Sequence, residues 1–176
     1  MLAPLWDYFC PKDPKTSPVL QITKEYYFSR LSVCVGPGLS GFEETKWITS
    51  EDTNIEHLLD IFTSIDTDSA SVWTACYKLI KQLHWYKPRP VSLGPKIKAL
   101  PDDHHFKPQC LYYLAWLSYT VGNSLECKQL LVHTLTLWRK CGFWNYRWVF
   151  LTLDCLSQVN QILGCYEEGV QQAKKC

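Results

Sequence analysis

The sequence carries almost no net charge, and this absence excludes one large class of function. Its formal net charge is +1, and its Lys and Arg residues are scattered, so it lacks the concentrated basic surface that displaces counterions from nucleic-acid phosphates. No apolar run approaches the roughly 20 residues that a helix needs to span a bilayer. The start, MLAPLWDYFCPKDP, has no basic leader and is broken by Pro4 and Pro11, unlike a secretory signal. We therefore expect a cytoplasmic protein that binds neither nucleic acid nor membranes.

Signatures of disulfide frameworks and zinc sites are also missing, although cysteine is abundant. The nine Cys are an odd number, with no Cys-x-x-Cys spacing and no Asn-x-Ser/Thr sequon. Hydrophobic residues make up 47% of the chain and aromatic residues 14%, which is enough to build a core and argues against disorder. We expect reduced, buried thiols in an intracellular protein.

The strongest positive pattern is a self-similarity after 42 residues in the last third of the chain. In each copy an apolar helical stripe runs into a glycine, and a second helix with an acidic start follows, as expected where the first helix ends in a left-handed cap. Two helical hairpins are predicted. One hairpin cannot bury its apolar face alone, so copies stack into a solenoid. The matched pairs are Leu111 with Leu153, Leu114 with Leu156, Gly122 with Gly164, Glu126 with Glu168 and Gln129 with Gln171.

Apolar spacing predicts further helices before the repeats. One helix is expected over 19–31, and a second begins at Thr49 or Ser50 and runs to about residue 64. A third, over 72–83, ends before Pro88 because proline blocks continuation. The sequence therefore predicts an all-α chain in three parts: 1–48, a short apolar helical stub, the 19–31 helix and a loop; 49–107, a helical hairpin and a proline-rich bridge with one helical turn near 96–100; and 108–176, two helical repeats.

Four segments resemble a group of large fungal signalling ATPases. They are similar to the region after the nucleotide-binding module of basidiomycete STAND proteins of the NACHT or NB-ARC type, which carry C-terminal tetratricopeptide (TPR) repeats. The resemblance covers nearly the whole chain, matches 1–35 to the end of a winged-helix region, and implies part of a NOD-like receptor whose repeats sense a ligand or partner. The segments are MLAPLWDYFCPKDPK, WITSEDTNIEHLLDIFTSID, LGPKIKALPDDHHFKPQCL and SYTVGNSLECKQLLVHTLTLWRK.

The same resemblance implies what is absent and how the repeats pack. No Gly-x-x-x-x-Gly-Lys-Ser/Thr phosphate loop occurs, so the ATPase activity does not carry over, and we expect no enzymatic activity and no cofactor. The TPR pattern implies a short right-handed solenoid, whose last unit is cut off at Cys176 and offers an end for self-association. Its small and apolar packing positions fall on Leu111, Leu114, Ala115, Ser118, Gly122, Cys127, Leu131 and Thr134, then on Leu153, Leu156, Ser157, Asn160, Gly164, Tyr166, Gly169, Ala173 and Cys176.

Ligands of TPR proteins usually meet the first helix of each unit, and this implies a partner-binding face. Tyr112, Trp116 and Tyr119 are spaced four and three apart, so they form one aromatic strip, and aromatic side chains are favoured interface anchors. The favoured alternative is that this strip packs on the 72–83 helix, which leaves the polar second unit as the contact surface. The expected face comprises Gln109, Tyr112, Trp116, Tyr119, Asp154, Gln158 and Gln161.

Other candidate sites have simpler interpretations. The tract 36–41 matches Gly-x-Gly-x-x-Gly, but the carboxylates that follow it would oppose a phosphate, so a loop is favoured. The aromatic residues Trp138, Phe143, Trp144, Tyr146 and Trp148 are interpreted as packing between the repeats. His133 is interpreted as a partly covered helix histidine.

The densest potential metal group is Asp102, Asp103, His104 and His105. Adjacent residues diverge, so at most two could face one ion, and His84 or His133 would have to complete the shell. A solvated turn without metal is favoured. A small metal-dependent hydrolase built on these four residues is the alternative function, and a bracing region with no activity of its own is the third.

Overall fold

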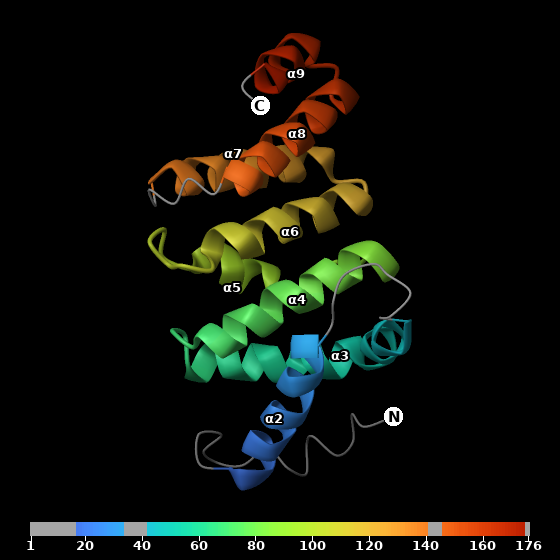
Figure 1. The fold of residues 1–176 in the computed structure, drawn as a ribbon, viewed down its shortest axis with the longest axis vertical. Helices are drawn as coiled ribbons and strands as arrows, with labels where there is room; N and C mark the ends of the chain where they lie inside the picture. The colour runs from blue at the N-terminus through green and yellow to red at the C-terminus, as the bar shows by residue number, and fades with distance from the viewer. Residues whose placement is uncertain (1–16, 34–41, 141–145, 175–176) are drawn as a thin grey trace. The chain divides into compact units, whose positions relative to one another are not determined.

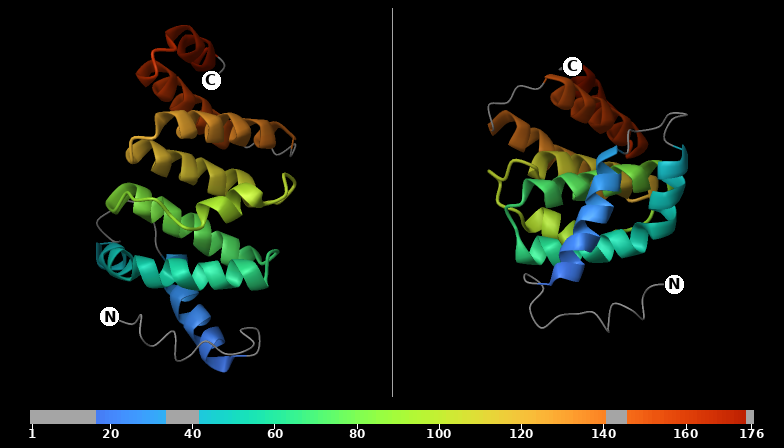
Figure 2. Two further views of the ribbon diagram at one scale, coloured as in Figure 1. Left: turned by 180° about the vertical axis from the view of Figure 1, so that it is seen from behind. Right: turned by 60° about the horizontal axis from the view of Figure 1, so that its bottom comes forward.

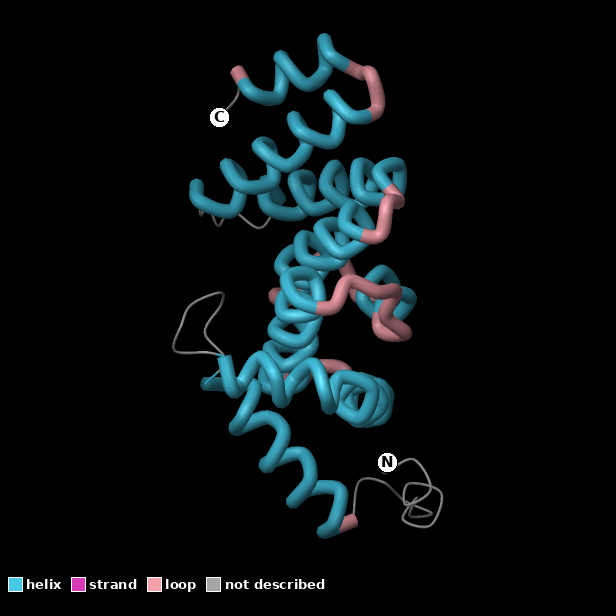
Figure 3. The backbone as a smooth tube through the Cα atoms, turned by 90° about the vertical axis from the view of Figure 1, so that its right-hand side faces the viewer, coloured by secondary structure: helices cyan, strands magenta, loops and turns pink. Residues whose placement is uncertain are grey.

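A computed structural model describes residues 17–33, 42–140 and 146–174, and within them every regular element is an α-helix (Figures 1 and 3). The prediction of an all-α chain is confirmed. None of the described helices is long and apolar enough to cross a membrane. The helices are α2 (Pro18–Val33), α3 (Phe42–Ile65), α4 (Ala70–Tyr86), α5 (Gly94–Ala99), α6 (Lys107–Thr120), α7 (Ser124–Lys140), α8 (Tyr146–Ile162) and α9 (Tyr166–Ala173).

The chain divides into two compact units. The first comprises residues 1–87 and 91–93, and the second comprises 88–90 and 94–176. This division differs from the boundaries expected from the sequence, because α2 shares a unit with the α3–α4 hairpin and α5 belongs with the repeats. The expected N-terminal stub, the 36–41 tract, Phe143 and Trp144 lie outside the described residues.

In the first unit, α3 and α4 form the predicted hairpin and α2 crosses them (Figure 2). Trp73 is buried, and its indole N–H donates to the carbonyl of Thr67 at 2.6 Å, which ties α4 to the turn before it. The α2 helix buries Tyr27, but Ile22 and Tyr26, which its apolar pattern also included, are exposed. Tyr77 is the one member of the predicted hairpin stripes that is only partly buried; the buried members are Ile55, Leu58, Leu59, Phe62, Val72, Trp73, Cys76, Ile80 and Leu83.

The start of α3 corrects the sequence prediction. The helix begins at Phe42, so Thr49 and Ser50 lie inside it rather than at its start. Their hydroxyls donate to the carbonyls of Lys46 and Trp47, three residues earlier, at 3.0 and 2.8 Å. Ser and Thr can therefore be accommodated within a helix by bonding back to it, and a capping residue type does not by itself fix a helix start.

In the second unit, α6 and α7 form one hairpin and α8 and α9 form another, with α7 packed against α8 and α5 against α6 (Figure 1). The predicted glycine bends are confirmed: Gly122 has φ 86° and Gly164 has φ 74°. Beyond α6, the N–H of Asn123 donates to the Ser118 carbonyl at 2.8 Å. Beyond α8, the N–H of Cys165 donates to the Asn160 carbonyl at 2.8 Å. The Gly122 N–H also donates to the Tyr119 carbonyl at 3.0 Å, and the Gly164 N–H donates to the Gln161 carbonyl at 3.1 Å. Together these bonds form two matching Schellman caps.

Small residues bring the paired helices close together. Cys127 and Asn160 are buried, as expected of packing positions. At Gly169 an added Cβ would lie 3.3 Å from the Ser157 carbonyl oxygen, and the Ser157 hydroxyl donates to the Gly169 carbonyl at 3.2 Å. The α8–α9 hairpin therefore closes around Gly169, one of the packing positions that the resemblance implied.

Candidate functional site

Tyr112, one of the predicted partner-binding residues, is a packing residue. Only 5% of its surface is exposed. Its ring centroid lies 5.4 Å from that of Trp148 in an edge-on contact, and Trp148 stacks on Trp138 at 5.9 Å. Burial raises the pKa of the Tyr112 hydroxyl, and a hydrogen bond with Trp116 acts in the opposite direction. Tyr112 and Trp148 thus join α6 to α8, and the predicted packing role of Trp138 and Trp148 is confirmed.

The other predicted residues of α6 are partly covered. Gln109, Trp116 and Tyr119 all have intermediate exposure. The rings of Trp116 and Tyr119 meet edge-on at 5.7 Å. The aromatic strip therefore exists as a spatial group, with Tyr112 at its buried end and two partly accessible rings beyond it.

The predicted residues of α8 are exposed. Asp154, Gln158 and Gln161 all reach solvent, and the Gln158 amide donates to the Asp154 carboxylate at 2.9 Å. The charge of Asp154 contributes to the raised pKa of Tyr112, which places it beside α6. Asp154 of α8 therefore lies close enough to Tyr112 of α6 for the two side chains to interact electrostatically.

Two exposed aromatic residues on α8 were not among the predicted partner-binding residues. Tyr146 is 75% exposed and Phe150 is 51% exposed, and with Asp154 they are spaced four apart, so they continue the same helical stripe. The interpretation of Tyr146 as a packing residue between repeats is wrong in this structure. The four-residue spacing was the available signal. We call the accessible set the first-helix face: Trp116, Tyr119, Tyr146, Phe150, Asp154, Gln158 and Gln161.

The proposed metal group does not converge on one point. The Asp102 carboxylate accepts a hydrogen bond from the Lys107 ammonium at 2.9 Å and contacts the His133 Nε2 at 3.2 Å. His104 instead accepts the N–H of Phe106 at its Nδ1, at 3.4 Å. Within the described ranges, no group of three or more His, Cys, Asp or Glu side chains could hold a metal ion.

Asp102 instead lies at the centre of a cluster of basic side chains. Lys107 is buried and also donates to the Leu100 carbonyl, while Lys140 approaches the second Asp102 oxygen at 3.8 Å. Hydrogen bonds from Lys107 and then from His133 hold the pKa of Asp102 below its usual value. We call Asp102, Lys107, His133 and Lys140 the Asp102 cluster.

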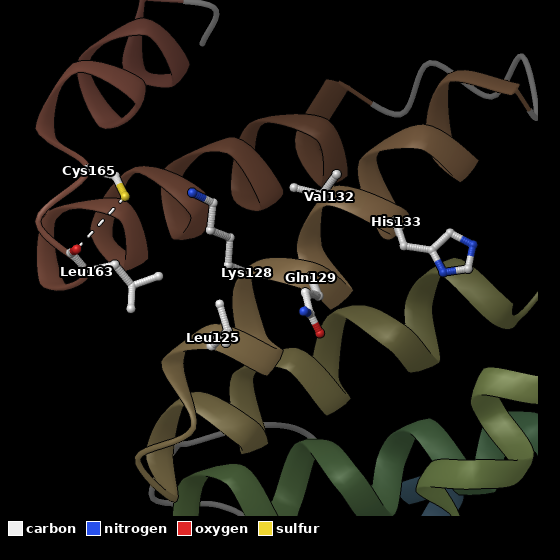
Figure 4. A pocket seen from close by; sticks show the side chains of 7 residues that line it. All are labelled: Leu125, Lys128, Gln129, Val132, His133, Leu163 and Cys165. Carbon is white, nitrogen blue, oxygen red and sulfur yellow. Dashed lines mark hydrogen bonds between the residues drawn. The ribbon is translucent and has the colours of Figure 1, made fainter.

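A hollow of about 620 Å³ lies on the outer side of α7 (Figure 4). Leu125 is 61% exposed and Val132 is 48% exposed on this side. Lys128, Gln129, Val132 and His133 follow Leu125 by three, four, seven and eight residues, which places them on one face of the helix. This spacing could have predicted the face, but the sequence analysis did not use it. We call it the α7 hollow, and it is lined by Leu125, Lys128, Gln129, Val132, His133, Leu163 and Cys165.

The prediction of buried thiols is confirmed for most of the described cysteines. Cys76, Cys110, Cys127 and Cys155 are buried, whereas Cys165 is partly exposed. Burial raises the pKa of Cys110. A hydrogen bond with the Cys127 thiol, followed by burial, raises the pKa of Cys155. The α7–α8 contact therefore holds two buried thiols side by side.

Comparisons of the chain with protein-family models, with curated proteins and with solved structures found no match.

Proposed function

We propose that this chain is a non-catalytic protein-interaction module whose TPR-like repeats bind a protein or peptide partner through the first-helix face. The observation that carries the proposal is the repetition of the helix, glycine and helix unit, whose copies share the same cap hydrogen bonds after Ser118 and Asn160. Hairpins that repeat in this way pack side by side and present an extended surface built from equivalent helices, which is the usual binding surface of helical-repeat proteins.

The chemistry of the first-helix face supports this use. Tyr146 and Phe150 offer large rings that are already exposed, so covering them with a partner removes apolar surface from water. Asp154, Gln158 and Gln161 continue the stripe with groups that can accept or donate hydrogen bonds. An aromatic anchor next to polar groups resembles the core and rim of a protein interface.

We also propose that the module belongs to a cytoplasmic STAND receptor of the fungal NACHT or NB-ARC type, as the resemblance implies. In such a receptor the repeats would receive the signal and a separate nucleotide-binding module would respond. The genomic sequence upstream of Met1 tests this assignment. A phosphate-loop module in frame supports it, and an upstream stop codon in every transcript contradicts it.

Binding is tested with peptides selected from a displayed random library against the full chain. Hydrogen–deuterium exchange then locates the bound peptide, and protection concentrated in α6 and α8 is expected. Phe150→Ala should weaken binding about fivefold or more, because it removes an exposed apolar anchor. Trp85→Ala is the matched control, since Trp85 is an exposed aromatic on α4.

Two results would reject the first-helix face. One is protection confined to other helices, and the other is equal loss of affinity in Phe150→Ala and Trp85→Ala. A module that only braces a larger protein would yield no peptide that binds saturably. Sedimentation across a range of protein concentrations separates self-association from binding of a different chain.

A further inference from the structure

We propose a second docking surface, the α7 hollow together with the Asp102 cluster, for an amphipathic acidic helix of a partner protein. The inference rests on the proposed function as an interaction module, and adds a different surface and a partner of stated chemistry. Its occupant carries apolar side chains at one end and carboxylates about two helical turns further along.

The apolar end of the surface lies around Leu125. Leu125, Val132 and Leu163 are each at least 36% exposed, and the hollow between them is open. Figure 4 shows Leu125 and Lys128 on α7 facing Leu163 and Cys165 at the turn between α8 and α9. An apolar side chain placed there would exclude water from several exposed carbon groups at once.

The charge of Lys128 is already balanced. Its ammonium donates a hydrogen bond to the Glu168 carboxylate at 2.7 Å, and this bond raises the pKa of Lys128. The Lys128 ammonium therefore leaves no unbalanced positive charge among the side chains that line the hollow near Leu125, and this end suits an uncharged apolar group.

At the other end of the surface, basic side chains outnumber the carboxylate that they share. Asp102 is shared by Lys107, His133 and Lys140. Lys140 lies 3.8 Å from the Asp102 oxygen and its side chain is 64% exposed, so it can accept a second carboxylate at little cost. Arg139 and Asp103, the sequence neighbours of Lys140 and Asp102, are both exposed and carry opposite charges. Charge complementarity therefore favours an acidic partner.

The spacing of the two ends defines the occupant. Leu125 and His133 lie eight residues apart on one face of α7, a distance of about 12 Å at the rise of an α-helix. A partner helix lying along α7 spans the same distance in about two turns. Its apolar and acidic groups should therefore stand about seven or eight residues apart on one face, in the helix-in-groove mode of recognition.

The test uses a synthetic alanine-rich helical peptide with leucines one turn apart and glutamates two turns further along. The matched control peptide has glutamines in place of the glutamates. Fluorescence anisotropy measures the affinity of both for the full chain. The rate of Cys165 alkylation, followed by peptide mass spectrometry, reports occupancy directly because Cys165 lines the hollow.

The acidic peptide should bind about fivefold more tightly than the glutamine peptide, and added salt should remove the difference. Val132→Ser should weaken both peptides about fivefold, because it removes apolar contact. Lys140→Glu should weaken only the acidic peptide. Lys46→Glu is the matched control, since Lys46 is an exposed residue of α3, and it should change neither affinity. Bound peptide should slow Cys165 alkylation severalfold.

Three results would overturn the inference: no binding of the acidic peptide, equal affinity for both peptides, or binding that leaves Cys165 alkylation unchanged. A dimer that Val132→Ser converts to monomer would also overturn it, because a second copy would then be the occupant. Binding of library-selected peptides at the first-helix face, with failure of the acidic peptide, rejects this inference alone. The opposite outcome rejects the first-helix face alone. In that case the acidic peptide binds, Phe150→Ala leaves its affinity unchanged, and no library-selected peptide binds at the first-helix face.

Discussion

Gly122 and Gly164 lie 42 residues apart in the sequence and adopt the same left-handed backbone conformation, with φ 86° and 74°. Each stands where the first helix of a hairpin ends, and each is followed by a residue whose N–H bonds back to the last turn at 2.8 Å. The repeat seen in the sequence is therefore also a repeat of backbone geometry and hydrogen bonding.

Gly122→Ala and Gly164→Ala should each destabilise the protein by about 1–2 kcal/mol. No atom lies within 4 Å of an added Cβ at either position, so the cost comes from the left-handed conformation alone. Urea unfolding followed by circular dichroism measures it. Gly94→Ala is the control, because its Cβ would lie at an ordinary 3.7 Å from Leu114 without a positive φ. An equal loss in all three variants would contradict this account.

Substitutions of Tyr112 and Phe150 should have different effects, the first on the stability of the fold and the second on peptide binding. Tyr112→Ala should cost about 3 kcal/mol of unfolding free energy, because Tyr112 is buried against Trp148. Phe150→Ala should change stability by less than about 0.5 kcal/mol, because Phe150 is half exposed. Only Phe150→Ala should reduce affinity for selected peptides while the fold stays intact. Thermal melts and anisotropy titrations distinguish the two effects, and a reversed pattern would place the binding surface elsewhere.

Asp102 should contribute stability that is lost in acid. Its pKa in the folded protein lies below the usual 3.8 because Lys107 and His133 hydrogen-bond its carboxylate. A carboxyl with a lowered folded-state pKa stabilises the fold above its unfolded pKa, and the contribution disappears as the pH falls through the folded value. Asp102→Asn should therefore be less stable than the parent at pH 7, and the difference should shrink below about pH 4. A difference that stays constant from pH 7 to pH 3 would exclude this ionic contribution.

Cys165 should react faster with iodoacetamide than the other described thiols. Cys76, Cys110, Cys127 and Cys155 are buried, and the raised pKa values of Cys110 and Cys155 keep them as unreactive thiols. Pulse alkylation with peptide mass spectrometry ranks the sites, and urea should remove the differences. Rapid native labelling of Cys127 or Cys155 would show that the α7–α8 contact opens readily.

Purified protein should contain no stoichiometric Zn, Mn or Fe if the interaction-module proposal is correct. Mass spectrometry of the metal content, before and after dialysis against chelator, checks this. A stoichiometric metal that is lost in His104→Ala, but retained in a control His57→Ala, would support the metal-dependent hydrolase instead. His57 is a suitable control because it is exposed and lies on α3.

Local signals in the sequence predicted much of the fold. The apolar stripe over 72–83 predicted the position of α4. Pro88 predicted where this helix must end, because a proline ring disfavours helical backbone at the residue before it, whatever the tertiary structure. Gly122 and Gly164 predicted the bends of both repeats for a similarly local reason, because glycine adopts a left-handed backbone conformation without a steric penalty. Thr49 and Ser50 misled because a hydroxyl can either cap a helix or bond back within it, and only the preceding residues decide which occurs.

The candidate surfaces depended on contacts distant in sequence. Periodicity placed Tyr112 and Phe150 on helical stripes, but it could not show that Trp148 covers the first and leaves the second exposed. Asp102 and His133 lie 31 residues apart, so no local pattern joins them. The sequence by itself determined where helices form and bend, because those preferences belong to short segments. The tertiary structure alone decided which faces are buried and where charges gather, because both depend on which helices become neighbours.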